Sequence, residues 1–352
     1  MEDTNETTAL SVVLAGPDDL RVERIPVPSV GDDAVRVRLG SCGICGSDLR
    51  YLRGENPWSQ HTLGRHVTSP PNMVLGHEVA GVARGADGET RVAILAYKAC
   101  GTCPACRAGR ENICANVQHI GHATGWGEMD YYPGGMAEEF EVWPGFAYPI
   151  PERISFDEAT FLDGLAVSIH ACDRARVEAG SRVGVVGLGP IGMMAAQVAT
   201  HRGASRVAAC DATELPVRLA HRVGLDEAVR ADALDFLDVA DEYDAIVDTI
   251  GTPETVAAAL RALRPGGALA LLAVHDGEIR VNQLALSGER LVTTPANNPY
   301  DDFPRAIELM AAGAVDVKSL VTHRFPLARA AEAFEIMANK ARMGAYKIVL
   351  HA

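Results

Sequence analysis

The sequence predicts an α/β protein of two domains, one rich in β-strands and one built on a doubly wound parallel sheet. A chain of 352 residues is long enough for each domain to bury its own core. The first 150 residues consist of short alternating segments interrupted by Pro and Gly, which is typical of strands. From residue 155 onward, helical and strand patterns alternate. Such a βαβ series indicates a parallel sheet with helices on both faces.

The elements follow one another in a regular order. The first strands are predicted at VVLAG (12–16), RVERIPV (21–27) and AVRVRLG (34–40), and turn residues are dense at 54–72 and 121–135. No helix of convincing length is expected there. The alternating series runs through FDEATFLDGLAVSIHACDRA (156–175), RVGVVGLG (182–189), PIGMMAAQVATHRG (190–203), RVAACD (206–211), LPVRLAHRVG (215–224), YDAIVDTIG (243–251), TPETVAAALRALRPGG (252–267) and ALALLAV (268–274).

The C-terminal part has no evident place in this series. It consists of two helical segments, FPRAIELMAAGAV (303–315) and ARAAEAFEIMANK (328–340), and a closing strand, YKIVLH (346–351). We therefore expect the tail to return and pack on the first domain.

The charge and the polarity of the chain exclude several partners. A formal net charge of −14 argues against nucleic acid or an anionic membrane. Residues 183–200 carry no charge, but four glycines, Pro190 and Gln197 fit a strand, a turn and a buried helix better than a membrane span. The N-terminus, MEDTNETTAL, is acidic and does not resemble a secretory signal, so we expect a cytoplasmic protein.

A glycine array indicates a dinucleotide site. Gly187, Gly189 and Gly192 follow an apolar strand and open a helix, and Asp211 ends the next strand 19 residues later. The glycines permit a tight turn, backbone approach to a pyrophosphate and close packing of the helix, whose N-terminus attracts phosphate. The predicted cofactor-binding set also contains Pro190, Ile191 and Ile250. Asp211 suits the ribose hydroxyls and repels a 2′-phosphate, as does Glu214, which favours NAD over NADP.

Four cysteines indicate a metal site. Cys100, Cys103, Cys106 and Cys114 have the spacing C-x2-C-x2-C-x7-C in a segment rich in Gly and Pro. Four thiolates satisfy a tetrahedral zinc ion completely, so this zinc would have a structural role. An iron–sulfur cluster is the alternative, but the fourth cysteine comes too late for the bacterial ferredoxin pattern and no proline follows it.

Taken together, the chain resembles the medium-chain, zinc-dependent alcohol dehydrogenases, and most of all their polyol and threonine dehydrogenase branch. The motifs are GICGSD (43–48), VLGHEVAG (74–81), the cysteine lobe, GGMAEEF (134–140), VGLGPIG (186–192) and VTHRFPL (321–327). The resemblance implies a GroES-like catalytic domain formed by residues 1–153 and 297–352. It also implies an NAD-binding Rossmann domain formed by residues 154–296.

The resemblance also implies a second, catalytic zinc. Its ligands would be Cys45, the cysteine ahead of G-S-D, and His77, whereas Cys42 matches no ligand position. The third family position, Cys or Glu in relatives, is Asp163 here. We expect Asp163 to bind zinc directly or through water. The alternative is that Glu78 replaces Asp163 as the ligand. If Asp163 is the ligand, Glu78 is expected to contact the ligands and not the zinc ion.

The resemblance assigns catalytic roles to Ser47 and Asp48, and the predicted catalytic set also includes Glu78. Ser47 matches the proton-relay position, and Asp48 is expected to accept a hydrogen bond from the ring N–H of His77. Many relatives carry a histidine three residues after the serine, where this chain has Arg50. Arginine cannot relay a proton, so Arg50 is expected to contact the cofactor phosphates instead.

The expected reaction is hydride transfer between NAD(H) and a secondary alcohol or ketone, with a polyol, sugar or cyclitol as the small-molecule substrate. Loop residues that could border the pocket are Trp58, His61, His66, His119, His122 and Trp126. Asn297–Asn298 replaces the aromatic–arginine pair usual in the polyol branch, which argues against a simple sorbitol pocket. The alternatives are a biosynthetic reductase of an aldehyde or ketone and a non-catalytic NAD- or zinc-binding protein. By resemblance, a homodimer or homotetramer is expected.

Overall fold

A computed structural model describes residues 7–85, 88–122, 124–273 and 275–352, which form two compact units. Unit 1 runs to Asp163 and resumes at Val321–Ala352, and unit 2 comprises Gly164–Leu320. The sequence suggests earlier boundaries, at 153/154 and 296/297. Hydrogen bonds explain part of the difference: the Gln197 amide donates to the Asp316 carbonyl (3.1 Å) and accepts from the Asp316 N–H (2.8 Å). These bonds hold the segment around Asp316 to unit 2.

The described residues of unit 1 form three β-sheets. A three-stranded sheet has the order β2-β1-β4, a seven-stranded sheet has the order β10-β6-β5-β3-β18-β17 with β9 also paired to β3, and β7 pairs with β8. The strands are β1 (Thr8–Gly16), β2 (Asp19–Pro26), β3 (Val35–Gly43), β4 (Met73–Val74), β5 (Glu78–Gly85), β6 (Gly88–Ile94), β7 (Tyr97–Lys98), β8 (Gln118–His119), β9 (Glu139–Val142), β10 (Ala147–Pro149), β17 (Val321–Pro326) and β18 (Lys347–His351).

The helices of unit 1 are short. They are α1 (Gly46–Leu52), the π-helix η1 (Ser59–Leu63), α2 (Pro104–Arg107), η2 (Glu111–Ile113), α3 (Phe156–Ala159), η5 (Leu327–Arg329), α10 (Ala330–Ala338) and α11 (Lys340–Met343). Within the described part of the first 150 residues, the longest helix is α1, with seven residues. The prediction of a β-rich first part is therefore confirmed.

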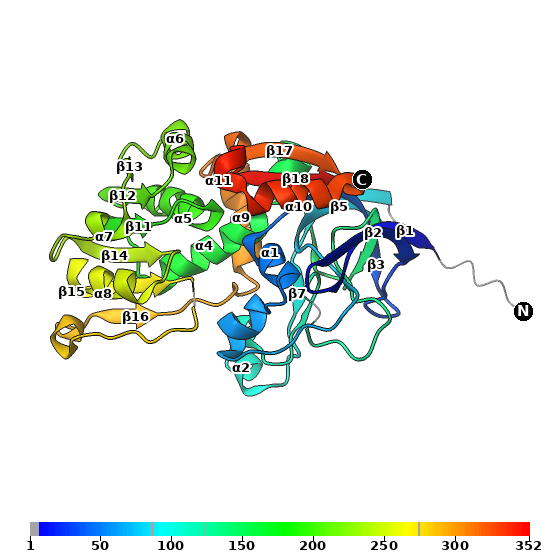
Figure 1. Ribbon diagram of the computed structural model, residues 1–352, viewed down its shortest axis with the longest axis horizontal. Coiled ribbons are helices and arrows are strands. Elements are labelled where there is room, and N and C mark those ends of the chain that lie inside the picture. Colours follow the sequence, from blue (N-terminus) through cyan, green and yellow to red (C-terminus); the bar gives the residue numbers. More distant parts are fainter. Residues whose placement is uncertain (1–6, 86–87, 123, 274) are drawn as a thin grey trace, which may run out of the picture. The chain divides into compact units, whose positions relative to one another are not determined.

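The two ends of the chain share one sheet. In β18, Val349 pairs with Gly43 and Leu350 pairs with Cys42 of β3, both antiparallel, while β17 lies parallel to β18 on its other side. Figure 1 shows these C-terminal strands, in red and orange, in the same unit as the blue and cyan strands of the first hundred residues. This pairing places the end of the chain beside the segments that precede α1 and begin β5.

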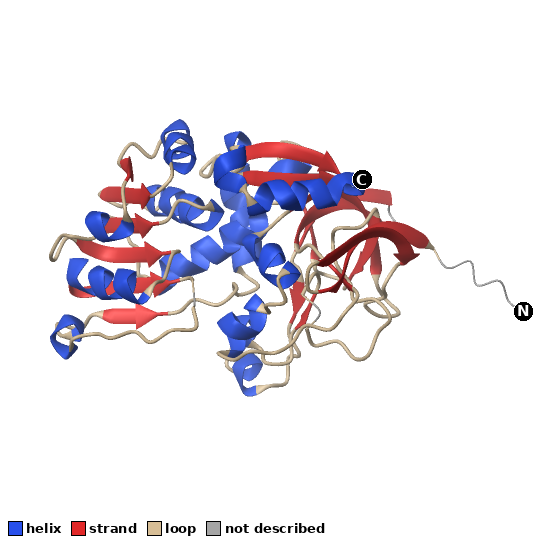
Figure 2. Ribbon diagram, viewed as in Figure 1, coloured by secondary structure: helices blue, strands red, loops and turns tan. Residues whose placement is uncertain are grey.

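Unit 2 is a six-stranded parallel sheet with helices packed along it (Figure 2). The strand order is β13-β12-β11-β14-β15-β16. Its elements are β11 (Arg182–Val186), α5 (Pro190–His201), β12 (Arg206–Asp211), α6 (Glu214–Arg222), β13 (Ala228–Arg230), α7 (Ala233–Phe236), β14 (Tyr243–Asp248), α8 (Pro253–Ala262), β15 (Leu263–Leu271), η3 (Gln283–Leu286), β16 (Leu291–Thr293), α9 (Asp302–Ala311) and η4 (Lys318–Leu320); α4 (Leu162–Arg174) begins in unit 1 and continues into unit 2.

The central strand of this sheet, β11, is buried on both of its faces. Val185 and Val186 of β11 point to opposite faces, and both are fully buried. Both faces are therefore covered, as in parallel sheets connected by helices. The prediction of a doubly wound parallel sheet is confirmed. Among the described residues, no helix combines the length and the apolar character needed to cross a lipid bilayer.

Candidate functional site

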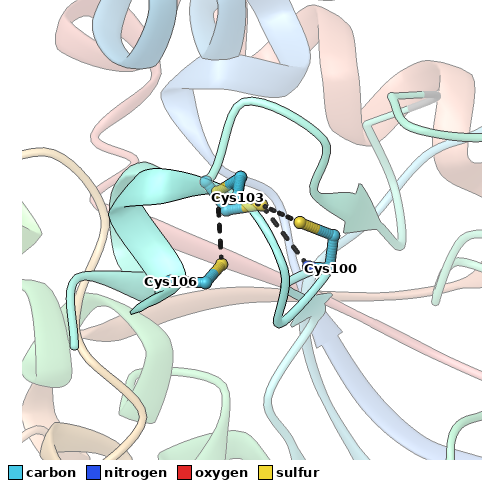
Figure 3. Close-up of side chains that lie close together, drawn as sticks. Cys100, Cys103 and Cys106 are labelled. Atoms are coloured by element: carbon cyan, nitrogen blue, oxygen red, sulfur yellow. Dashed lines mark hydrogen bonds between the residues drawn. The ribbon is translucent and has the colours of Figure 1, made fainter. Parts of the chain in front are cut away.

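The four cysteines of the lobe converge in unit 1. Cys103 caps α2, Cys106 lies within it, and Cys114 follows η2. Figure 3 shows Cys100, Cys103 and Cys106 pointing toward one another. The Sγ atoms are separated by 3.4 Å (103–106), 3.5 Å (100–114) and 3.8 Å (103–114), and all four cysteines are free thiols. The edge of a tetrahedron with Zn–S bonds of 2.3 Å is about 3.8 Å, so this arrangement fits zinc.

A second group lies where β3 and β5 run side by side. Gly43 at the end of β3 pairs with Glu78 at the start of β5, so Cys45 and His77 are brought together although 31 residues separate them. One ligand atom each from Cys45, His77 and Glu78 lies within 4.8 Å of the others. Cys42 is buried, pairs with Val79 in the sheet and is not part of this group. The geometry agrees with a role for Cys45 alone of the two cysteines.

Around Cys45, His77 and Glu78, acidic side chains outnumber basic ones. Burial alone would lower the pKa of His77, but the nearby Cys45 sulfur, Asp48 and Asp163 raise it to about 10. Burial raises the pKa of Asp48 and of Asp163 to about 6. A buried set with more acidic than basic side chains favours a divalent cation at its centre, because the cation would balance the charge. The donor set of thiolate, imidazole and carboxylate suits zinc.

Two carboxylates are candidates for the third ligand position. Asp163, in the first turn of α4, acts electrostatically on His77, but the compact three-residue group contains Glu78 instead. Glu78 in turn is ion-paired to Lys347 of β18. The assignment of Asp163 as a direct ligand stays a prediction.

The predicted catalytic and phosphate-binding residues of α1 have different surroundings. The Ser47 Oγ atom is buried without a hydrogen-bond partner. The Asp48 Oδ2 atom accepts from the Cys45 N–H (2.8 Å) and so caps α1, while its Oδ1 atom lies 3.9 Å from the His77 Nδ1 atom, beyond hydrogen-bonding range. Arg50 is bonded to Glu55 (2.7 Å) and to Gln60. Its predicted contact with cofactor phosphates would require it to leave these partners.

The glycine array of unit 2 forms the predicted turn between β11 and α5. Gly187 has φ +87°, and a Cβ on Gly192 would lie 1.9 Å from the Gly187 carbonyl oxygen, so only glycine fits there. Gly189 is the N-cap and Pro190 the first residue of α5, with Ile191 next to it in the first turn. The backbone N–H groups at this terminus can bind phosphate.

Asp211 ends β12 beside this turn. Its Oδ2 atom accepts from the Leu188 N–H (3.0 Å) and its Oδ1 atom from the Thr213 N–H (2.8 Å). A cavity of about 220 Å³ adjoins it, lined by Cys210, Asp211, Ala212, Ala231, Asp232, Ala233, Leu234, Ile250, Thr252, Glu254 and Thr255. The predicted residues Asp211 and Ile250 thus share one cavity, which three carboxylates make acidic.

Comparisons with known proteins identify the family of the chain. Residues 31–152 match the alcohol dehydrogenase GroES-like domain and residues 190–312 the zinc-binding dehydrogenase domain. The sorbitol dehydrogenase of Bos taurus is 31% identical over 93% of this chain and 92% of its own length. The chain belongs to the zinc-dependent alcohol dehydrogenase family. The solved L-idonate 5-dehydrogenase of Escherichia coli is 25% identical, with a TM-score of 0.86 over 98% of this chain and 99% of that one.

The resemblance to the polyol branch of this family is thereby confirmed. The Bacillus subtilis sorbitol dehydrogenase is 29% identical over 92% of each chain, and the galactitol-1-phosphate dehydrogenase structure of E. coli is 26% identical, with a TM-score of 0.80 over 97% of this chain and all of that one. The chain is an oxidoreductase, a zinc alcohol dehydrogenase that uses a nicotinamide dinucleotide. This finding decides against the non-catalytic alternative.

Lys347, the ion-pair partner of Glu78, is a site residue that the sequence did not predict. Lys347 is 1% exposed, and its Nζ atom lies 5.0 Å from the centre of the Phe161 ring. Burial would lower the pKa of Lys347, but the nearby Glu78 side chain and Cys45 sulfur raise it above its usual value. A lysine in the apolar strand YKIVLH is the only sequence signal. Gly43 is a second clue once the fold is known, because a Cβ there would lie 2.6 Å from the Lys347 Nζ atom.

The loop histidines divide into two groups. His119 and His122 lie at His77, with ring centroids 6.0 Å and 4.4 Å from it. His66 is exposed and contacts Gln60 (3.2 Å).

Asn298, one of the two asparagines that replace the aromatic–arginine pair, is fully buried in unit 2.

Proposed function

We propose that the chain oxidises a secondary alcohol of a polyol, sugar or cyclitol with NAD, in a reversible reaction. The observation that carries this proposal is the group of Cys45, His77 and Glu78, in which His77 and Glu78 are buried and Cys45 is partly buried, with the unpartnered hydroxyl of Ser47 in the adjoining first turn of α1. The named relatives support the substrate class, since they act on sorbitol, L-idonate and galactitol-1-phosphate.

Two zinc ions per chain are proposed. The catalytic ion would be held by Cys45, His77 and either Asp163 or Glu78, and the structural ion by the four cysteines of the lobe. When bound at the first site, zinc supplies a Lewis acid that lowers the pKa of an alcohol and polarises a carbonyl. The lobe has four thiolates for a four-coordinate ion, which leaves no position for substrate.

The protein's own groups would handle the proton. The Ser47 Oγ atom is proposed to accept the hydroxyl proton of the alcohol and to pass it on, since it has no competing partner in the protein. Asp48 fixes the start of α1 by its bond to the Cys45 N–H, which positions both Cys45 and Ser47. Arg50, engaged by Glu55 and Gln60, takes no part in the relay, so water carries the proton to solvent.

NAD is proposed as the cofactor because of Asp211. The acidic cavity at the end of β12 disfavours a 2′-phosphate and suits two ribose hydroxyls. A zinc-binding dehydrogenase of Sinorhizobium meliloti 1021, 28% identical with a TM-score of 0.85, was solved bound to NADP. The fold therefore also accepts NADP, and the residue at the end of β12 is proposed to determine the choice.

A homo-oligomer is proposed on the edge of the parallel sheet. The edge strand β16 and the segment before it expose apolar side chains, with Leu284 75% and Ile279 46% accessible. Light scattering after gel filtration would give a dimer or tetramer mass, and a monomer mass would refute this part of the proposal.

The test of the function combines metal analysis with an alcohol screen. Purified protein is expected to contain two zinc ions and to form NADH, read at 340 nm, with at least one polyol or vicinal diol. A Cys45→Ser variant should lose one zinc and the activity, whereas Cys42→Ala, a buried neighbour outside the group, should retain both. Equal turnover by the Cys45→Ser variant and the wild type would refute the assignment.

A further inference from the structure

His122 is enclosed by aromatic rings beside the proposed catalytic group. Its ring stacks on His119 (centroids 3.9 Å apart, planes at 21°) and meets His77 edge-on (4.4 Å, 61°). The Tyr51 ring closes a further side at 5.0 Å. These contacts fix the position of the imidazole without using its nitrogen atoms.

Neither nitrogen of His122 has a hydrogen-bond partner among the described residues, and both are shielded from solvent. His119 is different, because its Nδ1 atom donates to the Ile120 carbonyl at 2.8 Å. A buried donor or acceptor without a partner costs about 1–3 kcal/mol. His119 is therefore satisfied by the fold, whereas His122 carries an unmet hydrogen-bonding capacity next to a proposed metal ligand.

We propose that His122 hydrogen-bonds a second hydroxyl of the substrate, on the carbon adjacent to the one oxidised. This inference rests on the proposed function and names the feature that the enzyme selects, a vicinal diol. The reacting oxygen would lie near His77, and a neighbouring hydroxyl is within reach of a ring whose centre is 4.4 Å from that of His77. A hydroxyl both donates and accepts, so it can pair with either nitrogen of the imidazole. A simple secondary alcohol would leave His122 unpaired, and the enzyme would reject it for that reason.

The test compares 2,3-butanediol with 2-butanol, which differ only in the second hydroxyl. For the wild type, kcat/KM is expected to be at least tenfold higher for the diol. His122→Phe keeps the ring packing and should lower the diol-to-alcohol ratio of kcat/KM about 10- to 100-fold, the value of one buried hydrogen bond. His122→Gln, which retains an amide donor and acceptor, should recover part of the ratio. Calorimetric titration of the NADH complex with the diol should show weaker binding to His122→Phe.

Alternatives to a hydrogen bond from His122 to the substrate would give different results in these assays. His119→Phe is the matched control, and an equal loss of selectivity in this variant would mean that packing, and not a hydrogen bond, sets the ratio. Loss of zinc from His122→Phe would identify His122 as a metal ligand and overturn the inference. So would a wild-type ratio near one, or an unchanged ratio in His122→Phe. If the zinc-loaded wild type formed NADH with a polyol of the screen but not with 2,3-butanediol, the same comparison would use that polyol and its analogue lacking the adjacent hydroxyl. Absence of NADH with every polyol and diol tested would refute the proposed function itself.

Discussion

Replacement of Lys347 by methionine is expected to destabilise unit 1 strongly. The side chain is buried, its ammonium group pairs with the carboxylate of Glu78, and a Cβ on Gly43 would collide with both groups. Removal of one member of a buried ion pair leaves the other charge unpaired, which costs about 3–5 kcal/mol. Methionine fills a similar volume, so little of the loss would come from a cavity.

Urea unfolding followed by tryptophan fluorescence measures this effect in the relevant unit. Trp58, Trp126 and Trp143 are the only tryptophans of the chain, and all lie in unit 1. With an m value near 2 kcal/mol/M, the expected loss lowers the urea midpoint by about 1.5–2.5 M. Zinc and protein concentrations must be held constant, because metal binding adds to the apparent stability.

Two further variants serve as controls for this prediction. Lys340→Met removes an exposed lysine of the same unit and should change the unfolding free energy by less than about 0.5 kcal/mol. The double variant Lys347→Met/Glu78→Gln removes both charges and should regain at least half of the loss. A stabilising role of the Lys347–Glu78 pair is refuted if Lys347→Met unfolds at the same urea concentration as Lys340→Met, or if the double variant regains no stability.

Three further predictions concern other parts of the chain. Asp211→Ser should raise the NADP-to-NAD ratio of kcat/KM at least about 100-fold, since it removes the charge that repels a 2′-phosphate; equal use of both cofactors by the wild type would contradict this. Bonds from His351 (2.8 Å), Ser41 (2.5 Å) and Arg324 (2.7 Å) hold the pKa of the Asp157 carboxyl well below its usual value. The ionised Asp157 carboxylate therefore stabilises the fold above pH 4, and this stabilisation is lost as the pH falls toward the pKa of Asp157 in the folded protein. Asp157→Asn should lower the free energy of unfolding by about 1–3 kcal/mol at pH 7 and should make this free energy less dependent on pH in the acid range. Cys103→Ser should lose one zinc and retain the other, whereas iron in the wild-type protein would contradict the zinc assignment.

Local patterns in the sequence were sufficient to predict much of this molecule. The glycine turn with Asp211 and the four-cysteine lobe are formed by residues close in sequence, whose spacing alone limits their geometry. The strands and helices of unit 2 follow directly from the alternation of apolar periods. The resemblance to a family supplied the pairing of Cys45 with His77, which spacing could not supply.

Other features depend on contacts that no local pattern encodes. Lys347 reaches Glu78 only because β18 pairs with β3 and β3 with β5, two long-range registers. The same registers place Glu78 in the group where the family pattern suggested Asp163. Arg50 is bonded to Glu55 and Gln60 because of the local turn into η1, a π-helix that the sequence did not indicate. The sequence could not single out His122 from the six loop residues that it indicated. The structure does so, because both ring nitrogens of His122 are buried without a hydrogen-bond partner among the described residues.

The zinc content of the Cys45→Ser variant, measured beside the wild type together with NADH formation, tests the central claim most directly. We predict two zinc ions per wild-type chain and one in the variant, which keeps the lobe zinc and loses turnover. A wild-type enzyme that oxidises its alcohol at full rate with a single zinc, held by the lobe cysteines, would contradict the account.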